Sequence, residues 1–600
     1  MLLSDYVLKL LEQKKIKNVF MITGGAIAFI VDAFSRNKKI KYTCVAHEQA
    51  AAMMADAYSR VGPNLGATMV TSGPGATNLI TGIACSWFDS VPTIHISGQV
   101  NQHELSGHDK NTSKVRQVGF QETDIVSIVK PITKFAYQLK NENEIKYIFE
   151  KACHIAQSGR PGPVLIDIPM NLQRKKIIAS NLKNFKPIKE KVKQSKLIKK
   201  INLLKKKLKK SKRPVIIIGG GITISKQRDK LKFFLKNLNI PFVTTWSGQD
   251  CIAYDNKNNI GTIGVYGSRA GNFTIQNSDF IINLGSRLDT RITGGVPKTF
   301  ARNAFIASID IDNAELIKER GLKINLKINY SLKQFFETCL QKRNNLKIKR
   351  PEWLKKCKEW KEEFPSTTKD FFKDKKNVNP YVFMDYLNKY TSNNEIIITD
   401  DGANLTWTMQ GYKIKGRQRL ISAFGNSPMG YSFPAAIGAS IALKKKRIIC
   451  IDGDGSLQIN IQELQTMVSN KLPIKLIILN NSGYGIIKQF QELYLSKRYQ
   501  AVDSSKGVTN PNFRDIAKAY KINYSLIINN KNIESILRKT IKSNKAEFIE
   551  VRVKPDQKII PKLSFGKPIE DLSPLLSRKE FDKNMIIPKH NKTNKLDEIN

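Results

Sequence analysis

Short apolar runs alternate with amphipathic stretches along the first part of the chain. Such runs occur at Lys41–Ala46, Gly66–Thr71, Thr93–Ser97 and Pro163–Ile168, and each has the length of one buried strand. Strands that alternate with helical patterns predict a parallel sheet with helices on both faces. The pattern therefore predicts a doubly wound α/β domain at residues 1–180.

The same alternation recurs in two further segments, residues 195–345 and residues 379–560. Their predicted strands are Asp279–Leu284, Ala304–Ile311, Glu395–Thr399, Arg447–Ile451 and Ile474–Leu479. Residues 561–600 lack strand patterning and are rich in Lys, so we expect a basic, loop-rich tail. The fold class is thus predicted to be α/β, with three doubly wound parallel-sheet domains, which suits a chain too long for one hydrophobic core.

The charge balance raises the question of a nucleic-acid partner. Lys and Arg number 99 against 51 Asp and Glu, a formal net charge of +48. Nucleic-acid sites usually combine Arg and aromatic residues on one face, whereas the densest basic runs, Lys189–Lys212 and Lys342–Lys358, are nearly free of aromatics. These runs also lie where linkers between the segments are expected. A solvated basic surface is therefore favoured, and no nucleic-acid partner is expected.

The remaining composition points to an enzyme of the cytoplasm. The seven Cys and six His are scattered without a CxxC pair, which argues against a disulfide framework or a zinc site. No apolar run approaches the ~18 residues that a membrane span needs. The N-terminus lacks the apolar core and cleavage site of a signal peptide. We expect a cytoplasmic protein with no membrane partner.

The most specific local motif lies in the third segment. A strand ends in Asp452-Gly453-Asp454-Gly455-Ser456, a helical pattern follows, and the next strand ends at Asn480-Asn481. A right-handed βαβ unit places the carboxyl ends of its two strands side by side, where open α/β sheets bind ligands. Asp454, the Asn481 amide oxygen and a loop carbonyl, that of Gly483, form a hard-oxygen set that suits Mg²⁺. The following helix N-terminus offers free N–H groups to phosphates.

Together with other motifs, this one resembles the acetolactate synthase branch of thiamine diphosphate enzymes. The resemblance covers nearly all of residues 1–560. The segments that carry it are Ala46–Tyr58, Thr71–Asn78, Phe120–Glu122, Ser158–Pro163, Gly264–Phe273, Gly285–Arg291, Ile309–Asp312 and Met429–Ala436.

The resemblance implies roles for individual residues. Glu48 would share a proton with the pyrimidine ring of thiamine diphosphate, and Met429 would hold the cofactor in its bent shape. Because the two halves of the cofactor are held by different chains in this family, it also implies a homodimer or homotetramer. Further residues are assigned to catalysis (Phe120, Gln121) and to cofactor binding (Pro74, Asn78, Arg160, Gly453, Gly455, Ser456).

The middle segment is expected to bind FAD in a structural role. Gly219-Gly220-Gly221 after a strand is a weak dinucleotide signal, because it lacks the spaced GxGxxG order, and an ordinary strand-to-helix turn explains it equally well. The resemblance to the flavin-contacting segments of the family is the stronger support. It assigns Gly219, Gly220, Gly267, Arg287 and Asp310 to the flavin.

Three departures from the family pattern bear on the substrate. Met170 stands where the family has a Lys, Phe490 stands where it has a Trp, and Met21-Ile-Thr-Gly24-Gly25 replaces its Gly-Tyr-Pro-Gly-Gly. Arg287, whose counterpart helps to bind the acceptor, is retained. The segments Asp503–Val508 and Pro568–Pro574 resemble relatives from polysaccharide and branched-sugar synthesis.

The resulting hypothesis is a carboligase that decarboxylates pyruvate and transfers the hydroxyethyl unit to a second 2-oxo acid, giving 2-acetolactate. One alternative keeps this donor and uses a nucleotide-activated keto sugar as acceptor. An alternative of another class is a non-catalytic basic scaffold or nucleic-acid-binding protein, against which the retained Glu48, Asp454 and Asn481 argue. Members of the family often work with a small regulatory subunit, and no segment of the sequence locates a surface for it.

Overall fold

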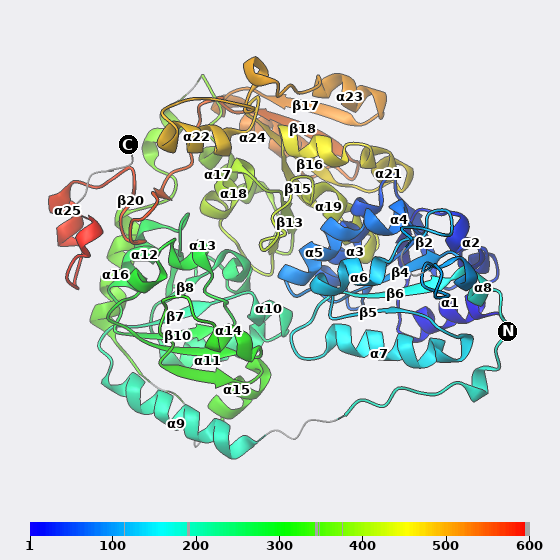
Figure 1. The fold of residues 1–600 in the computed structure, drawn as a ribbon. Coiled ribbons are helices and arrows are strands. Elements are labelled where there is room, and N and C mark those ends of the chain that lie inside the picture. Colours follow the sequence, from blue (N-terminus) through cyan, green and yellow to red (C-terminus); the bar gives the residue numbers. More distant parts are fainter. Residues whose placement is uncertain (113–114, 189–192, 342–345, 347, 375, 594–600) are drawn as a thin grey trace.

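The computed structural model describes residues 1–112, 115–188, 193–341, 346, 348–374 and 376–593 (Figure 1). Its strands form three parallel sheets of six strands each and one small antiparallel pair. Helices cover the faces of the large sheets (Figure 1). This arrangement confirms the predicted α/β class with three doubly wound parallel sheets.

The first sheet has the strand order β2-β1-β3-β4-β6-β5. The four strands predicted in this region are present as β2, β3, β4 and β6. The strands are β1 (Asn18–Met21), β2 (Lys41–Cys44), β3 (Gly66–Val70), β4 (Thr93–Gln99), β5 (Phe135–Gln138) and β6 (Val164–Pro169). The helices are α1 (Leu3–Gln13), α2 (Ala28–Asp32), α3 (Glu48–Val61), α4 (Pro74–Thr77), α5 (Ile80–Phe88), α6 (Ile125–Val129), α7 (Ile145–Gln157) and α8 (Met170–Gln173).

The middle sheet has the order β12-β11-β10-β7-β8-β9. Its strands are β7 (Pro214–Ile218), β8 (Phe242–Thr244), β9 (Asn259–Thr262), β10 (Phe280–Leu284), β11 (Phe305–Asp310) and β12 (Leu326–Asn329). The helices are α9 (Gln194–Lys210), α10 (Gly221–Ile224), α11 (Arg228–Leu238), α12 (Arg269–Gln276), α13 (Thr290–Thr293), α14 (Asn313–Ile317), α15 (Leu332–Cys339) and α16 (Pro351–Glu363).

The basic runs are helices rather than linkers where the structure describes them. Helix α9 buries Leu197, Ile201, Leu204 and Leu208 and leaves its lysines on the outer face. Helix α16 likewise buries one side, which includes Trp353 and Trp360. Apolar residues three and four apart form a stripe on one side of a helix. The burial of this stripe explains why both segments are helical although they are rich in lysine. Residues 189–192, 342–345 and 347 lie outside the described residues.

The third sheet has the order β14-β13-β15-β16-β18-β17. Its strands are β13 (Ile396–Thr399), β14 (Arg419–Ile421), β15 (Ile449–Gly453), β16 (Lys475–Asn480), β17 (Asn523–Ile527) and β18 (Glu547–Arg552). The helices are α17 (Pro380–Tyr390), α18 (Ala403–Gly411), α19 (Ser432–Ala442), α20 (Asp454–Leu457), α21 (Glu463–Ser469), α22 (Gly485–Tyr494), α23 (Phe513–Ala519) and α24 (Ile533–Thr540).

Helices α3 and α19 join the first and third sheets at the centre of the molecule (Figure 1). A Cβ atom at Gly438 of α19 would lie 2.1 Å from the carbonyl oxygen of Met54 in α3. Glycine is therefore required for this close approach of the two backbones. The α3 residues Ala51, Met54, Ala55 and Tyr58 are buried in the core cluster that this interface forms.

Residues 561–593 are not the loop-rich tail predicted above. They form the antiparallel pair β19 (Lys562–Leu563) and β20 (Leu572–Ser573) and the helix α25 (Arg578–Lys583). Glu570 is 1% exposed and pairs with Arg302 of the middle domain at 2.8 Å. Ile569, Leu572 and Phe581 enter the same hydrophobic core as α12 and α16. The segment has too little periodicity to reveal this packing, because its partner surface lies far away in the sequence.

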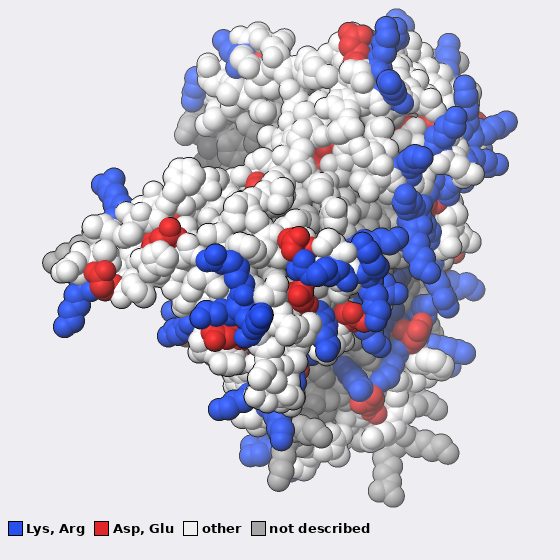
Figure 2. Space-filling view, turned by 90° about the vertical axis from the view of Figure 1, so that its right-hand side faces the viewer, with Lys and Arg blue, Asp and Glu red and all other residues white. Residues whose placement is uncertain are grey.

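Basic side chains are numerous on the face of the molecule drawn in Figure 2. Figure 2 shows Lys and Arg over much of one face, with Asp and Glu interspersed among them. Twenty-five ion pairs join described residues, so part of the positive charge is paired with carboxylates. Among the helices of the described residues, none is both long and apolar enough to cross a membrane.

Candidate active site

The predicted metal residues lie together at the carboxyl edge of the third sheet. Strands β15 and β16 are parallel neighbours, and their register pairs Gly453 with Leu479. Asp454 and Asn481, which follow these strands, are thereby placed at one edge of the sheet. One carboxylate oxygen of Asp454 accepts hydrogen bonds from the Gly483 amide at 2.9 Å and from the Asn510 side chain at 2.7 Å.

The environment of Asp454 suits a divalent cation. The residue is 3% exposed, and burial raises the pKa of its carboxyl group to about 6, although hydrogen bonds from Gly483 and Asn510 oppose this shift. A buried carboxylate of this kind is stabilised by a positive charge. With the amide oxygen of Asn481 and the carbonyl of Gly483, it supplies the oxygen ligands that Mg²⁺ prefers.

The loop around Asp454 combines a buried polar atom with closely packed glycines. The Oδ1 atom of Asn404, in the first turn of α18, is buried and has no hydrogen-bond partner among the described residues. A Cβ atom at Gly453 would lie 2.9 Å from the Asn404 side chain, and one at Gly455 would lie 2.4 Å from the ring of Tyr484. Ser456 is buried in the first turn of α20. An unsatisfied amide and a glycine-lined turn fit a diphosphate together with its metal.

Met429 lies on a turn that precedes α19. The amides of Gly430 and Ser432 donate to the two carboxylate oxygens of Asp400 at 3.1 and 2.9 Å. Asp400 is fully buried at the end of β13, and burial, together with the nearby charge of Asp452, raises its pKa well above the usual value. Gly430 has φ = +82°, a conformation that favours glycine. The buried Asp400 carboxylate therefore fixes the turn that carries Met429.

Glu48 begins helix α3 in the first domain. It is 9% exposed, and one of its carboxylate oxygens accepts a hydrogen bond of 2.9 Å from the side chain of Asn78. Pro74 begins the short helix α4 of the same loop. The hydroxyl of Thr71 in this loop is buried and has no hydrogen-bond partner in the part of the chain that the structure describes. The Glu48 carboxylate is thus held in a partly satisfied polar site.

A residue that sequence reasoning missed fixes the start of α3. Glu463 of the third domain accepts hydrogen bonds from the amides of Ala46 and His47 at 3.0 and 3.1 Å. Asn404 and Asn510 were missed as well. Asn404 follows the carboxyl end of a parallel strand, a signal that could have identified it. Glu463 and Asn510 carry no comparable local signal.

Phe120 and Gln121 lie on an exposed loop beside Gly73. The backbone of Gln121 has φ = +63°, and its carbonyl oxygen would lie 2.9 Å from a Cβ atom at Gly73. The Phe120 side chain is 86% exposed. Gln121 therefore borders the loop of Pro74 and Asn78, whereas Phe120 extends into solvent in the single chain.

The residues assigned to the acceptor come from different domains. Met170 begins α8 at the end of β6 in the first domain, and Phe490 lies in α22 of the third domain. Among the described residues, no hydrogen bond or ring contact joins Met170 to Phe490, or Glu48 to Asp454. The predicted site residues thus fall into two groups, one carried by the first domain and one by the third.

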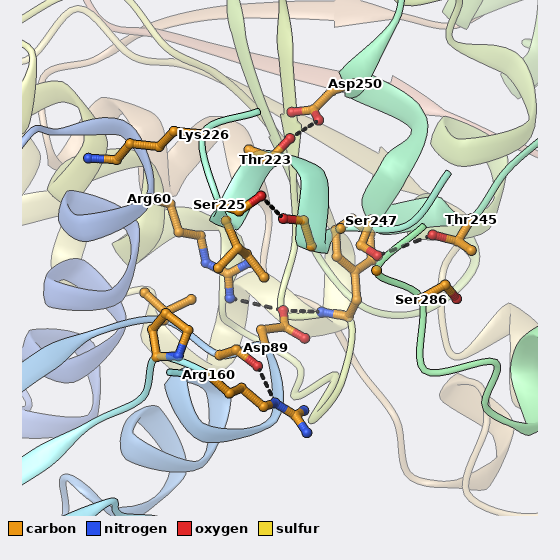
Figure 3. A pocket seen from close by; sticks show the side chains of 18 of the residues that line it. Arg60, Asp89, Arg160, Thr223, Ser225, Lys226, Thr245, Ser247, Asp250 and Ser286 are labelled. Carbon is orange, nitrogen blue, oxygen red and sulfur yellow. Dashed lines mark hydrogen bonds and ion pairs between the residues drawn. The ribbon is translucent and has the colours of Figure 1, made fainter. Parts of the chain in front are cut away.

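A large cavity of about 730 Å³ lies where the three domains meet. Of the residues assigned to the flavin, Gly220, Arg287 and Asp310 line it, and so does Arg160, which was assigned to cofactor binding. Figure 3 shows Arg60 and Arg160 on the side of the first domain and Ser247 and Ser286 on the side of the middle domain. The volume is in the range of cofactor and ligand sites.

The lining of this cavity fits a dinucleotide. Arg160 is held by Ser90 at 2.8 Å and by Asp312 and Glu315 at 3.0 Å each. Burial raises the pKa of Asp310, at the end of β11, to about 6. A Cβ atom at Gly220, just after β7, would lie 2.9 Å from the hydroxyl of Ser247. A glycine turn and a strand-end carboxylate are the features of a dinucleotide site in an α/β sheet.

Gly219 and Gly267 are not among the residues that line the cavity. A Cβ atom at Gly219 would lie 2.3 Å from the carbonyl oxygen of Gly285, and one at Gly267 would lie 2.5 Å from the carbonyl carbon of Ile263. Close backbone packing explains both glycines. They shape the loops beside the cavity.

Comparison with known proteins defines the class and then the family. Three family models match in chain order: the N-terminal TPP binding domain of thiamine pyrophosphate enzymes at residues 1–128, the central domain at 201–338, and the C-terminal TPP binding domain at 400–551. The fold and these matches define a thiamine diphosphate enzyme of three α/β domains, which confirms the prediction of this cofactor.

The chain belongs to the acetolactate synthase large subunit family. It is 34% identical to the acetolactate synthase large subunit of Cyanidium caldarium, with 94% of each chain covered. Identity to the protein of that name from Lactococcus lactis subsp. lactis (strain IL1403) is also 34%, again over 94% of each chain. For the Pyropia yezoensis protein it is 33% over 92% of each chain. The resemblance stated from the motifs is thus confirmed.

Proposed function

We propose that this protein is an acetolactate synthase-type carboligase that decarboxylates pyruvate and transfers the two-carbon unit to a second 2-oxo acid. The observation that carries the proposal is the pair of half-sites: Glu48 held by Asn78, and buried Asp454 beside Asn481. The test is the formation of 2-acetolactate from pyruvate by the purified chain with thiamine diphosphate and Mg²⁺. Pyruvate left unconsumed under these conditions overturns the proposal.

The residues of the two half-sites would have different roles toward the cofactor. Thiamine diphosphate, when bound, supplies the carbanion stabilisation that decarboxylation of a 2-oxo acid requires. Asp454, Asn481 and the Gly483 carbonyl would hold Mg²⁺ against the diphosphate. Glu48 would hold a proton at the pyrimidine ring nitrogen, and Met429 would support the cofactor from its fixed turn.

A homodimer would complete the site, as part of a dimeric or tetrameric assembly. One half-site would come from the first domain of one copy and the other from the third domain of its partner. The exposed Phe120, with its neighbour Gln121, would then lie over the site of the second copy. The burial of an exposed aromatic side chain of this size also favours association. A small regulatory subunit fits the family and would bind elsewhere.

We also propose that the central cavity binds FAD in a structural role, because carboligation has no net redox change. Protein purified from cells supplied with riboflavin should therefore be yellow, with a flavin absorption spectrum. Replacing Gly220 by Leu should remove the colour, since the larger side chain would meet Ser247. Leu at the exposed Gly295, where a Cβ atom meets no neighbour and the backbone has no positive φ, serves as the control. A colourless parent protein with full activity contradicts the flavin proposal.

A nucleotide-activated keto sugar is the second candidate acceptor. The observation that favours it is Met170, which cannot donate a hydrogen bond or supply a charge to a carboxylate. The same donor chemistry would then deliver the two-carbon unit to a sugar carbonyl. A basic scaffold without catalysis is not favoured, since acidic side chains lie among the basic ones on the face drawn in Figure 2.

The choice of 2-oxo acid tests the role of Phe490. One methylene in an apolar pocket is worth only ~1–3 kcal/mol, about 10–200-fold in selectivity. Because the ring of Phe490 is smaller than the Trp indole of the family pattern, we expect much of this selectivity for the larger acceptor to be lost. We expect little preference for 2-oxobutanoate over pyruvate as acceptor, and an increase of that preference in Phe490→Trp. Competition between the two acids, with both acetohydroxy acids quantified, measures it. A strong preference in the parent protein would remove Phe490 from the acceptor pocket.

A further inference from the structure

A short C-terminal strap, residues 558–565, lies along helix α22, which follows the metal loop. The side chain of Gln489 donates to the carbonyl of Ile559 at 3.1 Å and accepts from its amide at 2.9 Å. The amide of Phe565 donates to the hydroxyl of Tyr494 at 3.1 Å. On its other side, the amide of Leu563 donates to the carbonyl of Val265 at 2.8 Å. The strap thus connects α22 to the middle domain.

The strap and α22 share an aromatic cluster formed by Phe490, Tyr494 and Phe565. The rings of Tyr494 and Phe565 stack with centroids 4.4 Å apart, and Phe490 meets both edge-on, at 5.0 and 5.6 Å. Phe565 is nevertheless 60% exposed. The residue proposed above to line the acceptor site is therefore positioned by a segment more than 70 positions away in the sequence.

Lys562 of the strap brings a positive charge to this cluster. The residue is only 7% exposed, and its ammonium lies 5.8 Å from the centroid of the Tyr494 ring. Within the described part of the chain, no hydrogen bond or ion pair joins this ammonium to another residue. Desolvation lowers its pKa to about 8. Partial desolvation of an ammonium without a counter-ion is costly, and an anion beside it would offset that cost.

The position of this charge relative to the metal loop points to the acceptor. Helix α22 begins at Gly485, just after Asn481 and Gly483, and Tyr494 lies nine residues further on. At about 1.5 Å per residue, this places the cluster roughly 13 Å along the helix from the diphosphate anchor. A bound diphosphate would be held by the metal and the glycine turn, which would leave the Lys562 charge to a different anion.

We propose that Lys562 binds the anionic group of the acceptor, either the carboxylate of a 2-oxo acid or a phosphate of a nucleotide-activated keto sugar. This inference rests on the proposed function and names the acceptor class: a molecule with an anionic group that reaches α22. It also accounts for the charge that Met170 does not supply in the first domain.

The test compares Lys562→Met, Lys562→Arg and the matched control Lys361→Met in the full chain with thiamine diphosphate and Mg²⁺. Lys361 also packs on a tyrosine ring, at 4.2 Å from Tyr254, and its pKa is also lowered to about 8 by desolvation. Its ammonium, however, is bonded to backbone carbonyls in the middle domain. One arm supplies pyruvate with 2-oxobutanoate, and the other supplies pyruvate with a UDP-linked 4-keto hexose.

In the arm that contains the true acceptor, Lys562→Met should raise the acceptor KM about tenfold or more, as expected for the loss of a hydrogen bond between two charged groups, with little change in kcat. Lys562→Arg should restore most of the affinity, and Lys361→Met should leave KM unchanged. An unchanged KM in both arms for Lys562→Met overturns the inference.

A separate readout distinguishes failure of this inference from failure of the proposed function. Sub-stoichiometric labelled pyruvate leaves no second molecule to act as acceptor, so CO₂ release reports the donor step alone. We expect Lys562→Met to release CO₂ at the rate of the parent protein. A Lys562→Met protein whose CO₂ release falls as far as its carboligation contradicts an acceptor-specific role. A parent protein that releases no CO₂ overturns the proposed function itself.

Discussion

Replacing Glu48 by glutamine should abolish most turnover and leave cofactor binding largely intact. The amide can still contact the pyrimidine ring and can still receive the hydrogen bond from Asn78. It cannot, however, share a proton with the ring nitrogen. The loss of a positioned acid–base group typically costs about 10²–10⁴-fold in rate. Pyruvate consumption and calorimetric titration with thiamine diphosphate, measured on the same preparation, separate the two effects.

The same substitution at Glu144 provides the control. Glu144 also lies in the first domain and also accepts hydrogen bonds, from Tyr137 and Asn141. It is not one of the predicted site residues. Glu144→Gln should retain the turnover of the parent protein. If Glu48→Gln retains it as well, Glu48 has no part in proton transfer.

The sequence was most informative where chemistry and topology are local. Asp454 and Asn481 follow consecutive parallel strands, so the rules of βαβ handedness place them together without knowledge of the rest of the chain. The strand register in the structure agrees with this placement. Glu48 was found in a different way, from a motif of the family, and its hydrogen bond to Asn78 lies within the same domain.

The sequence was least informative where a residue depends on a distant partner. Glu463 fixes the start of α3 across a domain interface, and Asn510 reaches Asp454 from a loop 56 positions away. The strap that carries Lys562 belonged to a segment predicted to be a tail. The positions of its buried residues are set by the surface of the middle domain on which they pack. They do not recur every 2 or 3.6 residues, and such recurrence is the signal that pattern analysis detects.

Replacing Asp454 by alanine should affect the binding of the cofactor rather than the chemical step. The change removes the one carboxylate of the proposed metal set and leaves the diphosphate poorly neutralised. Loss of an outer-sphere partner of a metal site costs about 10–100-fold in affinity, and loss of a ligand should cost at least as much. We expect the apparent affinity for thiamine diphosphate to collapse, with partial rescue by excess Mg²⁺.

The rescue separates this effect from unfolding. Excess Mg²⁺ can restore metal occupancy through Asn481 and the Gly483 carbonyl only if the loop keeps its shape. In the parent protein, Asp454 contributes to that shape by accepting hydrogen bonds from Gly483 and Asn510. Thermal unfolding of the metal-free variant therefore belongs beside the calorimetry. Asp515→Ala, at an exposed carboxylate in the first turn of α23, is the matched control and should bind the cofactor normally. Unchanged cofactor affinity in Asp454→Ala would show that the metal is held elsewhere in the protein.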